Sequence, residues 1–295
     1  MADFILSCCA TADLAKSHMD SRSISYASPP YFLDGKEYRD DLFQSMAASD
    51  FYQAMVDGAD TKTSQPNMEE FLQYFEKLLE QGKDILHISL SSGLSGTFNS
   101  ATNAVNIARE RHPDRKIYII DSLAASSGYG LLMDKAADLR DEGKTIEEVR
   151  DWVEENKLNL HHWFFTSDLT FFIKGGRVSK TAGFVGGLLG ICPLLNVSNE
   201  GRLIPREKIR SKKKVIRTIV EKMKENAEGG LEYSERCFLC NSACKEDAEA
   251  VVALVKEAFP NIRGDIIIND IGPSIGSHTG PGTVALFFWG KKRED

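Results

Sequence analysis

Short apolar runs alternate with helix-like patterns through the first half of the chain. The predicted strands are residues 4–7, 84–89 and 116–120. Two of the helical patterns begin with a capping box, formed by Asn67 with Glu70 and by Thr145 with Glu148. Strands that alternate with helices are typical of βα units, so this half predicts an α/β fold with a largely parallel sheet.

The pattern changes after Asn156. From Trp163 onward, glycine-rich turns and longer irregular stretches separate the apolar runs. Further strands are predicted near residues 202–205, 236–241, 265–271 and 283–289. We therefore expect two domains, residues 1–160 and 161–295, and a chain of 295 residues is long enough to form two cores.

The charge and the hydropathy of the chain argue against several classes of protein. With 36 basic and 43 acidic residues the net charge is −7, which argues against a nucleic-acid binder, because such proteins are usually basic. No stretch approaches the roughly 20 apolar residues that span a bilayer. The first residues, Met1 to Phe4, lack the basic and apolar regions of a secretory signal. We expect a cytoplasmic protein with no membrane span.

Neither a metal nor a nucleotide is indicated. Cys237, Cys240 and Cys244 are spaced like zinc ligands, but a closed zinc site needs four ligands and the chain has no second pair. Buried free thiols are expected instead. The sequence contains no P-loop and no kinase glycine-rich loop, so we expect no cofactor and no binding of ATP by this chain.

Three polar segments lie at strand ends or tight turns, where open α/β sheets bind ligands. Residues 61–66 carry Thr63 and Ser64, which could donate to a ligand or cap the next helix. Residues 91–97 place four hydroxyls and two glycines at a helix N-terminus. That arrangement suits a carboxylate or a phosphate, although helix capping alone would use one hydroxyl.

The third segment, residues 272–282, holds His278 between glycines on a predicted loop. A lone histidine is more often structural, but an imidazolium here would complement a carboxylate. Ser95, Asp121 and His278 also follow the order of a serine hydrolase triad. This alternative is weakened by Thr97, which stands where the nucleophile elbow G-x-S-x-G needs glycine.

Two basic segments and one apolar segment belong to the second half. The turn at 174–180 and the run at 202–217 are rich in Lys and Arg, which predicts docking of an acidic partner or a phosphate, unless they are solvated faces. Residues 184–195 mix apolar and small side chains. They suit tight core packing or the wall of an acyl tunnel, and the pattern does not choose between them.

Five short motifs along the chain together resemble those of a known family. The motifs TSQP at 63–66, SSGLSGT at 91–97, Asp-Ser at 121–122, KGGRVS at 174–179 and GSHTGPG at 276–282 are similar, in order and spacing, to those of the DegV family. The resemblance implies a three-layer α/β/α domain with a parallel sheet, followed by a two-layer domain with a mixed six-stranded sheet. It also implies a lipid-binding protein and not an enzyme.

The implied ligand is one long-chain fatty acid such as palmitate. The resemblance makes Thr63 and Ser95 the head-group ligands, with Ser64, Gly96 and His278 close by. It places the acyl chain in the second domain, beside residues 184–195. Some members are the acyl-carrying subunit of bacterial fatty acid kinase, so a separate ATP-binding subunit is a possible partner. Three arginines in the basic segments are predicted to contact it: Arg177, Arg202 and Arg206.

One departure from the family pattern lies after the first strand. Where the family usually has a Thr-Asp-Ser turn, this chain has Ser7-Cys8-Cys9-Ala10. A thiol is a weak hydrogen-bond donor. The missing acid and hydroxyl therefore argue against a head-group role for this turn.

Overall fold

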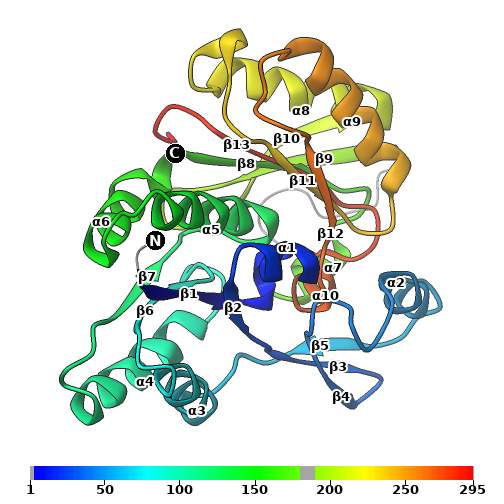
Figure 1. The fold of residues 1–295 in the computed structure, drawn as a ribbon. Coiled ribbons are helices and arrows are strands. Elements are labelled where there is room, and N and C mark those ends of the chain that lie inside the picture. The colour runs from blue at the N-terminus through cyan, green and yellow to red at the C-terminus, as the bar shows by residue number, and fades with distance from the viewer. Residues whose placement is uncertain (1–2, 180–189, 295) are drawn as a thin grey trace.

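The computed structural model describes residues 3–179 and 190–294 of the chain. Within these residues the chain forms three sheets with helices packed between and outside them (Figure 1). In spatial order the strands are β2 (Ile24–Ala27), β1 (Phe4–Cys9), β6 (Asp84–Ser89) and β7 (Ile117–Asp121) in sheet A; β4 (Lys36–Arg39), β3 (Pro30–Leu33) and β5 (Thr61–Thr63) in sheet B; and β10 (Leu203–Arg210), β9 (Ile191–Val197), β8 (Leu160–Phe165), β13 (Val284–Trp289), β11 (Phe238–Asn241) and β12 (Ile267–Asp270) in sheet C. The helices are α1 (Lys16–Ser21), α2 (Ala48–Val56), α3 (Met68–Leu79), α4 (Thr97–Arg111), α5 (Ser126–Asp141), α6 (Ile146–Asn156), α7 (Thr170–Lys174), α8 (Lys212–Asn226), α9 (Lys245–Ala258) and α10 (Pro273–Thr279).

Sheet A is parallel and covered on both faces. Alternate residues of β1 enter different cores: Phe4 and Leu6 pack on the side of α5, and Ile5 packs on the side of α3 and α4. Both faces are apolar because helices cover both, as is usual for parallel sheets. The predicted three-layer α/β/α arrangement is confirmed.

Sheet C is a mixed sheet, as expected. Its neighbouring strands are antiparallel except for β11 and β12, which pair in parallel. Helices α8 and α9 cover its outer face, and α5 lies between sheet C and sheet A (Figure 1). One hydrophobic cluster therefore runs from sheet A through α5 to sheet C and α8. The division into residues 1–160 and 161–295 stays a prediction; sheet A lies before it, and sheet C begins at Leu160, the last residue of the first range.

The sequence did not predict sheet B. Residues 30–63, here called the sheet B segment, form its three strands and α2. This segment has its own aromatic cluster, which includes Tyr31, Phe51 and Tyr52. It packs against α10, and Lys174 on α7 forms an ion pair with Asp60 (Nζ to Oδ1, 2.6 Å). The segment thus connects the first half of the chain to elements of the second half.

Both predicted capping boxes are present. Asn67 and Glu70 exchange side-chain to backbone hydrogen bonds at the start of α3, and Thr145 and Glu148 do the same at the start of α6. No helix in residues 3–179 or 190–294 is long and apolar enough to cross a membrane.

Candidate functional site

A cavity of about 400 Å³ lies where the carboxyl edge of sheet A meets sheet C and α10. This is the edge at which open α/β sheets bind ligands. Hydroxyl groups line one part of the cavity and aromatic and aliphatic side chains line another. Arg177 is the single charged side chain among its described lining residues. The cavity therefore combines one cation, several hydroxyls and an apolar wall.

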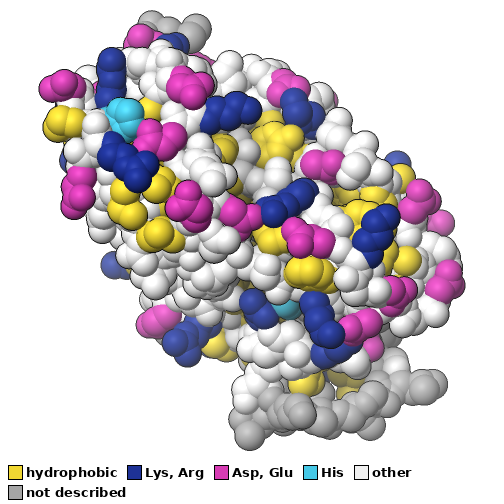
Figure 2. Space-filling view, turned by 90° about the horizontal axis from the view of Figure 1, so that it is seen from below, with side chains coloured by type: hydrophobic (Ala, Val, Ile, Leu, Met, Phe, Trp, Pro, Cys, Tyr) yellow, Lys and Arg dark blue, Asp and Glu magenta, His cyan; other side chains and the backbone are white. Residues whose placement is uncertain are grey.

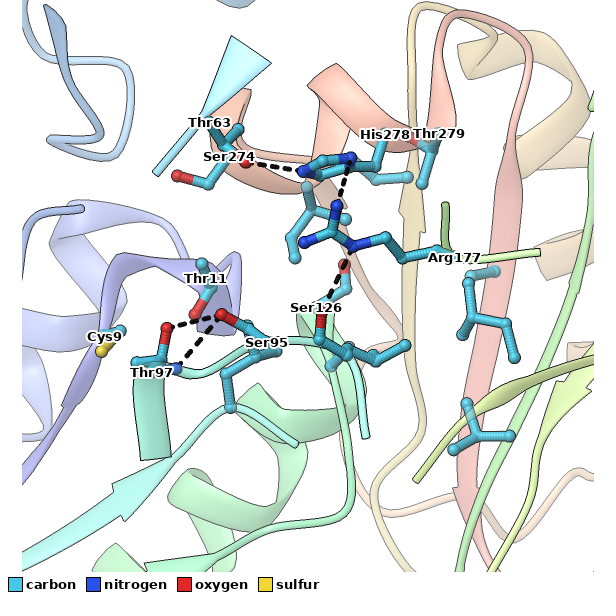
Figure 3. Close-up of a pocket in the computed structure, with 18 of the residues that line it drawn as sticks. Cys9, Thr11, Thr63, Ser95, Thr97, Ser126, Arg177, Ser274, His278 and Thr279 are labelled. Atoms are coloured by element: carbon cyan, nitrogen blue, oxygen red, sulfur yellow. Dashed lines mark hydrogen bonds between the residues drawn. The ribbon is translucent and has the colours of Figure 1, made fainter. Parts of the chain in front are cut away.

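Three side chains form a hydrogen-bonded chain at the polar end. His278 on α10 contacts Thr63 on β5 (Nε2 to Oγ1, 2.6 Å) and Arg177 (Nδ1 to Nη1, 3.3 Å), as the dashed lines in Figure 3 show. Gly175 makes this packing possible, because a Cβ there would lie 2.3 Å from His278 Nδ1. The structure thus brings together residues from three of the motifs found in the sequence.

The direction of these hydrogen bonds follows from Arg177. A guanidinium only donates, so His278 Nδ1 must accept and His278 Nε2 must carry the proton. Nε2 then donates to the Thr63 oxygen. Thr63 is left with its own hydroxyl proton to offer to a ligand in the cavity.

His278 differs in two ways from the expectation. It lies in the last turn of α10 and not on a loop. It is also neutral at physiological pH, because burial, with a further contribution from the charge of Arg177, lowers its pKa to about 4. The predicted imidazolium is therefore wrong. Arg177 supplies the positive charge.

Arg177 lies inside the cavity and not on an open docking face. Its other hydrogen bonds go to backbone carbonyls, from Nε to Leu94 (3.2 Å) and from Nη1 to Gly175 (2.5 Å). No carboxylate of the described residues pairs with it. A half-buried cation with neutral partners is a favourable place for an anion, because its charge is otherwise uncompensated.

The start of α4 supplies the second group of hydroxyls. Ser95 Oγ hydrogen-bonds Thr97 Oγ1 (2.8 Å) and accepts from Thr97 N (3.2 Å), and both residues line the cavity (Figure 3). Ser64 and Gly96 line it as well. Gly96 lies against the side chain of Gln65, because a Cβ there would lie 2.3 Å from the amide oxygen of Gln65. All five predicted head-group residues therefore border one cavity.

Sheet C provides the apolar wall. The lining side chains there include Phe164, Phe287, Val197 and Leu203, and α7 adds Phe172. These residues belong to the second half of the chain, where the acyl chain was predicted to run. Of the predicted tunnel segment 184–195, residues 184–189 lie outside the described residues, and residues 191–195 belong to β9.

Two lining positions, which sequence reasoning did not predict, lie within and just after the turn that departs from the family pattern. Cys9 ends β1 at the cavity wall, and burial raises the pKa of its thiol to about 12. It therefore stays a neutral thiol. Thr11, two residues later, is buried, and its hydroxyl has no hydrogen-bond partner in the described structure. Thr11 stands between Ala10 and Ala12, so no polar pattern in the sequence marks this position.

The hydrolase alternative is not supported by the geometry. Asp121 accepts from the backbone N–H groups of Ser92 and Leu123 and does not contact His278. Its carboxylate holds the loop that carries Ser95 in place. Ser95 bonds Thr97, and His278 bonds Thr63 and Arg177, so the described residues contain no Ser–His–Asp relay.

The two other predicted docking arginines lie outside the cavity. Arg202 is exposed on the turn between β9 and β10, and its Cγ lies 3.0 Å from the place of a Cβ on Gly93. This puts it beside the loop of Ser95. Arg206 is exposed on β10 and donates to Asn196 (Nε to Oδ1, 2.8 Å).

The cysteines and the surface charge add two further observations. Cys237 and Cys240 are buried, as expected, and in residues 3–179 and 190–294 no three metal-ligating side chains come together. Figure 2 shows basic and acidic side chains interspersed over the face seen from below, and not one continuous basic surface.

The comparisons with known proteins agree with this geometry. The DegV family model, described as "Uncharacterised protein, DegV family", matches residues 10–291. A DegV domain-containing protein of Clostridium perfringens is 37% identical over 294 residues, 100% of both chains. A protein of Thermotoga maritima named fatty acid-binding protein is 34% identical over 282 residues, 94% of each chain.

A solved structure extends the comparison to a ligand complex. The fatty acid kinase B3 protein of Streptococcus pneumoniae, loaded with linoleic acid, is 25% identical with a TM-score of 0.83, covering 99% of this chain and 100% of that one. The chain is therefore similar to these relatives in sequence and, for the solved structure, in fold over nearly its whole length.

Proposed function

Because the chain belongs to the DegV family, we propose that it binds one long-chain fatty acid and, as a binding protein and not an enzyme, carries it without altering it. The observation that carries the proposal is Arg177, a cation with no carboxylate partner among the described residues, in a cavity lined by hydroxyls and by apolar side chains. A fatty acid has the matching parts, because it joins one carboxylate to a long apolar tail.

The carboxylate would lie between Thr63 and Ser95. Thr63 has a hydroxyl proton to donate, since its oxygen accepts from His278, and Ser95 is on the facing loop at the start of α4. Ser64, Gly96 and His278 surround this position, and Arg177 neutralises the charge. Charge-assisted hydrogen bonds of this kind are stronger than those between neutral groups.

The acyl chain would lie against Phe164, Phe172 and Phe287 on the sheet C side. Burying a 16-carbon tail such as that of palmitate at about 0.8 kcal/mol per CH₂ gives roughly 12 kcal/mol before costs. Lost freedom of the ligand and ordering of side chains take back about 4 kcal/mol or more. The remainder suits micromolar or tighter binding.

Two measurements test the proposal. Mass spectrometry of an organic extract of the purified protein should detect a co-purifying fatty acid. In a titration with palmitate, Thr63→Ala and Ser95→Ala should each weaken binding by about 1.5–3 kcal/mol, the value of a hydrogen bond to a charged group. The fold should be unchanged by circular dichroism. Wild-type affinity in the double variant would refute the head-group assignment.

The same family resemblance suggests a partner. We propose that the chain presents its fatty acid to a separate ATP-binding subunit of a fatty acid kinase. Arg202 favours this, because it is exposed beside the loop that carries Ser95, near the polar end of the cavity. Arg206 lies farther along the same hairpin. An arginine can grip a carboxylate or a phosphate of the partner with two N–H groups.

Charge reversal tests the docking role. Arg202→Glu should slow association with the ATP-binding subunit and reduce its salt sensitivity, while palmitate affinity stays within about twofold. Lys256→Glu on the outer helix α9 is the matched control, since Lys256 is also exposed but lies away from the cavity. Lower lipid binding in Arg202→Glu, with phosphorylation per bound lipid unchanged, would contradict docking. The protein alone should not hydrolyse ATP.

A further inference from the structure

Two buried side chains of the sheet B segment hold the N-terminal turn of α10, the helix that carries His278. Tyr52 Oη donates to the carbonyl of Ile271 (2.6 Å), just before the helix. Asp40 Oδ2 accepts from the backbone N–H of Ser274 (3.2 Å), in its first turn. Tyr52 is 2% exposed and Asp40 is 0% exposed, and neither lines the cavity.

Helix α10 depends on these contacts for its orientation. It has seven residues, and its N-cap is Gly272, which has no side chain with which to cap it. Asp40, 234 residues away in the sequence, supplies the missing acceptor. The helix also packs closely on Tyr52, because a Cβ on Gly276 would lie 2.5 Å from Tyr52 Oη. So short a helix is oriented by what it packs against, and not by its own stability.

The sheet B segment fixes the other end of the site too. Thr63 ends β5, which pairs with β3 through Tyr31 and Thr63. One segment therefore supplies Thr63 and also holds the helix that bears His278. The hydrogen bond between Thr63 and His278 (2.6 Å) persists only while the two atoms stay within about 3.2 Å, so a rotation of α10 that moves the imidazole by more than about 0.6 Å would break it.

We propose that Tyr52 is a positioning residue of the carboxylate site, with Asp40 as its partner in this role. By holding the backbone that enters α10, Tyr52 keeps His278 within reach of Thr63 before any ligand arrives. The proposal rests on the proposed function for the identity of the ligand. The contact that the proposal explains, between His278 and Thr63, is present in the protein without a ligand.

Tyr52→Phe removes the one hydrogen bond and keeps the ring. Tyr233→Phe is the matched control. Tyr233 is 1% exposed and lies outside the cavity, and its Oη also donates to a backbone carbonyl, that of Arg236 (2.7 Å). It accepts in addition from the backbone N–H of Trp289 (3.0 Å). Tyr233→Phe therefore loses at least as much buried hydrogen bonding as Tyr52→Phe, which makes it a strict control for the general cost in stability. Only Tyr52→Phe loosens α10.

The binding readout compares tetradecanoate with tetradecan-1-ol. The two ligands have the same tail, and only the acid needs the positioned carboxylate site. Tyr52→Phe should weaken binding of the acid by about fivefold and of the alcohol by less than about twofold. Tyr233→Phe should leave the ratio of the two affinities unchanged. Equal losses for acid and alcohol in Tyr52→Phe would overturn the proposal.

A second readout needs no ligand. The ¹⁵N signals of the His278 ring, assigned with His278→Gln, should show one tautomer in the wild type, with the proton on Nε2. In Tyr52→Phe they should shift toward an average of tautomers, and in Tyr233→Phe they should not. Unchanged signals in Tyr52→Phe would overturn the positioning role. If the wild type binds acid and alcohol equally, the proposed head-group site fails, while the ring signals still decide the positioning role.

Asp40 allows a graded version of the experiment. Asp40→Asn keeps a side-chain oxygen that can accept from Ser274 N, and Asp40→Ala keeps none. The ratio of acid to alcohol affinity should therefore fall less in Asp40→Asn than in Asp40→Ala. Equal ratios in both variants and the wild type would remove Asp40 from the proposal.

Discussion

Gly175 lies where the basic turn at 174–180 meets His278. Its φ of −73° is open to any residue, so Gly175→Ala adds no backbone strain. The new Cβ would lie 2.3 Å from His278 Nδ1, the atom that accepts from Arg177. We expect the imidazole to be displaced and palmitate binding to weaken by about tenfold, through loss of the Thr63 and Arg177 contacts.

Gly176→Ala is the control for this prediction. Gly176 has φ +73° with no atom within 4 Å of a Cβ, so alanine there is strained but touches nothing. It should lower the free energy of unfolding by about 1–2 kcal/mol and leave palmitate affinity unchanged. Equal losses of affinity in the two variants, by isothermal titration, would mean that the turn as a whole, and not His278, is responsible.

For these individual residues, the charge of the head-group site could not be predicted from the sequence. The motifs identified Thr63, Ser95 and His278, because each stands in a short polar segment with glycine or proline nearby. The contact of Arg177 with His278 spans 101 residues, and no local pattern reports it. The neutral state of His278 follows from burial beside that arginine, which exists only in the fold.

Among the helices and strands, those marked by a pattern of neighbouring residues in the sequence could be predicted. Strands β1, β6 and β7 of sheet A are mainly apolar and were predicted, whereas the short strand β2 was not. Helices α3 and α6 begin with capping boxes, whose partners are three residues apart. The sheet B segment has no such signal. Strands β3 and β4 have four residues each, and β3 also pairs with β5, about thirty residues farther along. Pairing over that distance depends on tertiary packing.

The capping box of α6 gives a prediction about stability. Thr145→Ala removes the side chain that accepts from Glu148 N (3.2 Å). The free energy of unfolding should fall by about 1 kcal/mol, the usual value of an N-cap. Palmitate affinity should not change, since α6 does not line the cavity. Urea denaturation followed by circular dichroism measures the first effect, and an unchanged midpoint would contradict it.

For the whole molecule, buried histidines set the response to acid. Burial lowers the pKa of His87 from 6.5 to about 3, and burial lowers that of His161 to about 4. The unfolded chain takes up these protons below pH 6.5 and the native protein does not. The contribution of these two histidines to stability is therefore complete above pH 6.5 and is lost as the pH falls from 6.5 toward 4. Asp40 acts in the opposite sense, because burial raises its pKa to about 6.

A single substitution isolates one of these contributions. Between pH 7.5 and 5.5, His87 should account for about 1.4 kcal/mol of the loss in unfolding free energy. In His87→Gln the difference between the two pH values should shrink by that amount, whatever the substitution costs at pH 7.5. Urea titrations at both pH values measure it. An unchanged difference would show that the pKa of His87 in the native protein is close to its value in the unfolded chain.

The strand order of sheet C has a consequence for biosynthesis. Strand β13 lies between β8 and β11, yet it is the last of the six to leave the ribosome. Until then, β8 to β10 and β11 with β12 are separate groups with open edges, and the buried face of each is exposed to the cell. Helix α10 emerges just before β13, so His278 is synthesised more than 200 residues after its partner Thr63. A nascent chain therefore cannot complete the Thr63–His278 contact before α10 has emerged. It is during this interval that chaperones would need to protect its apolar surfaces.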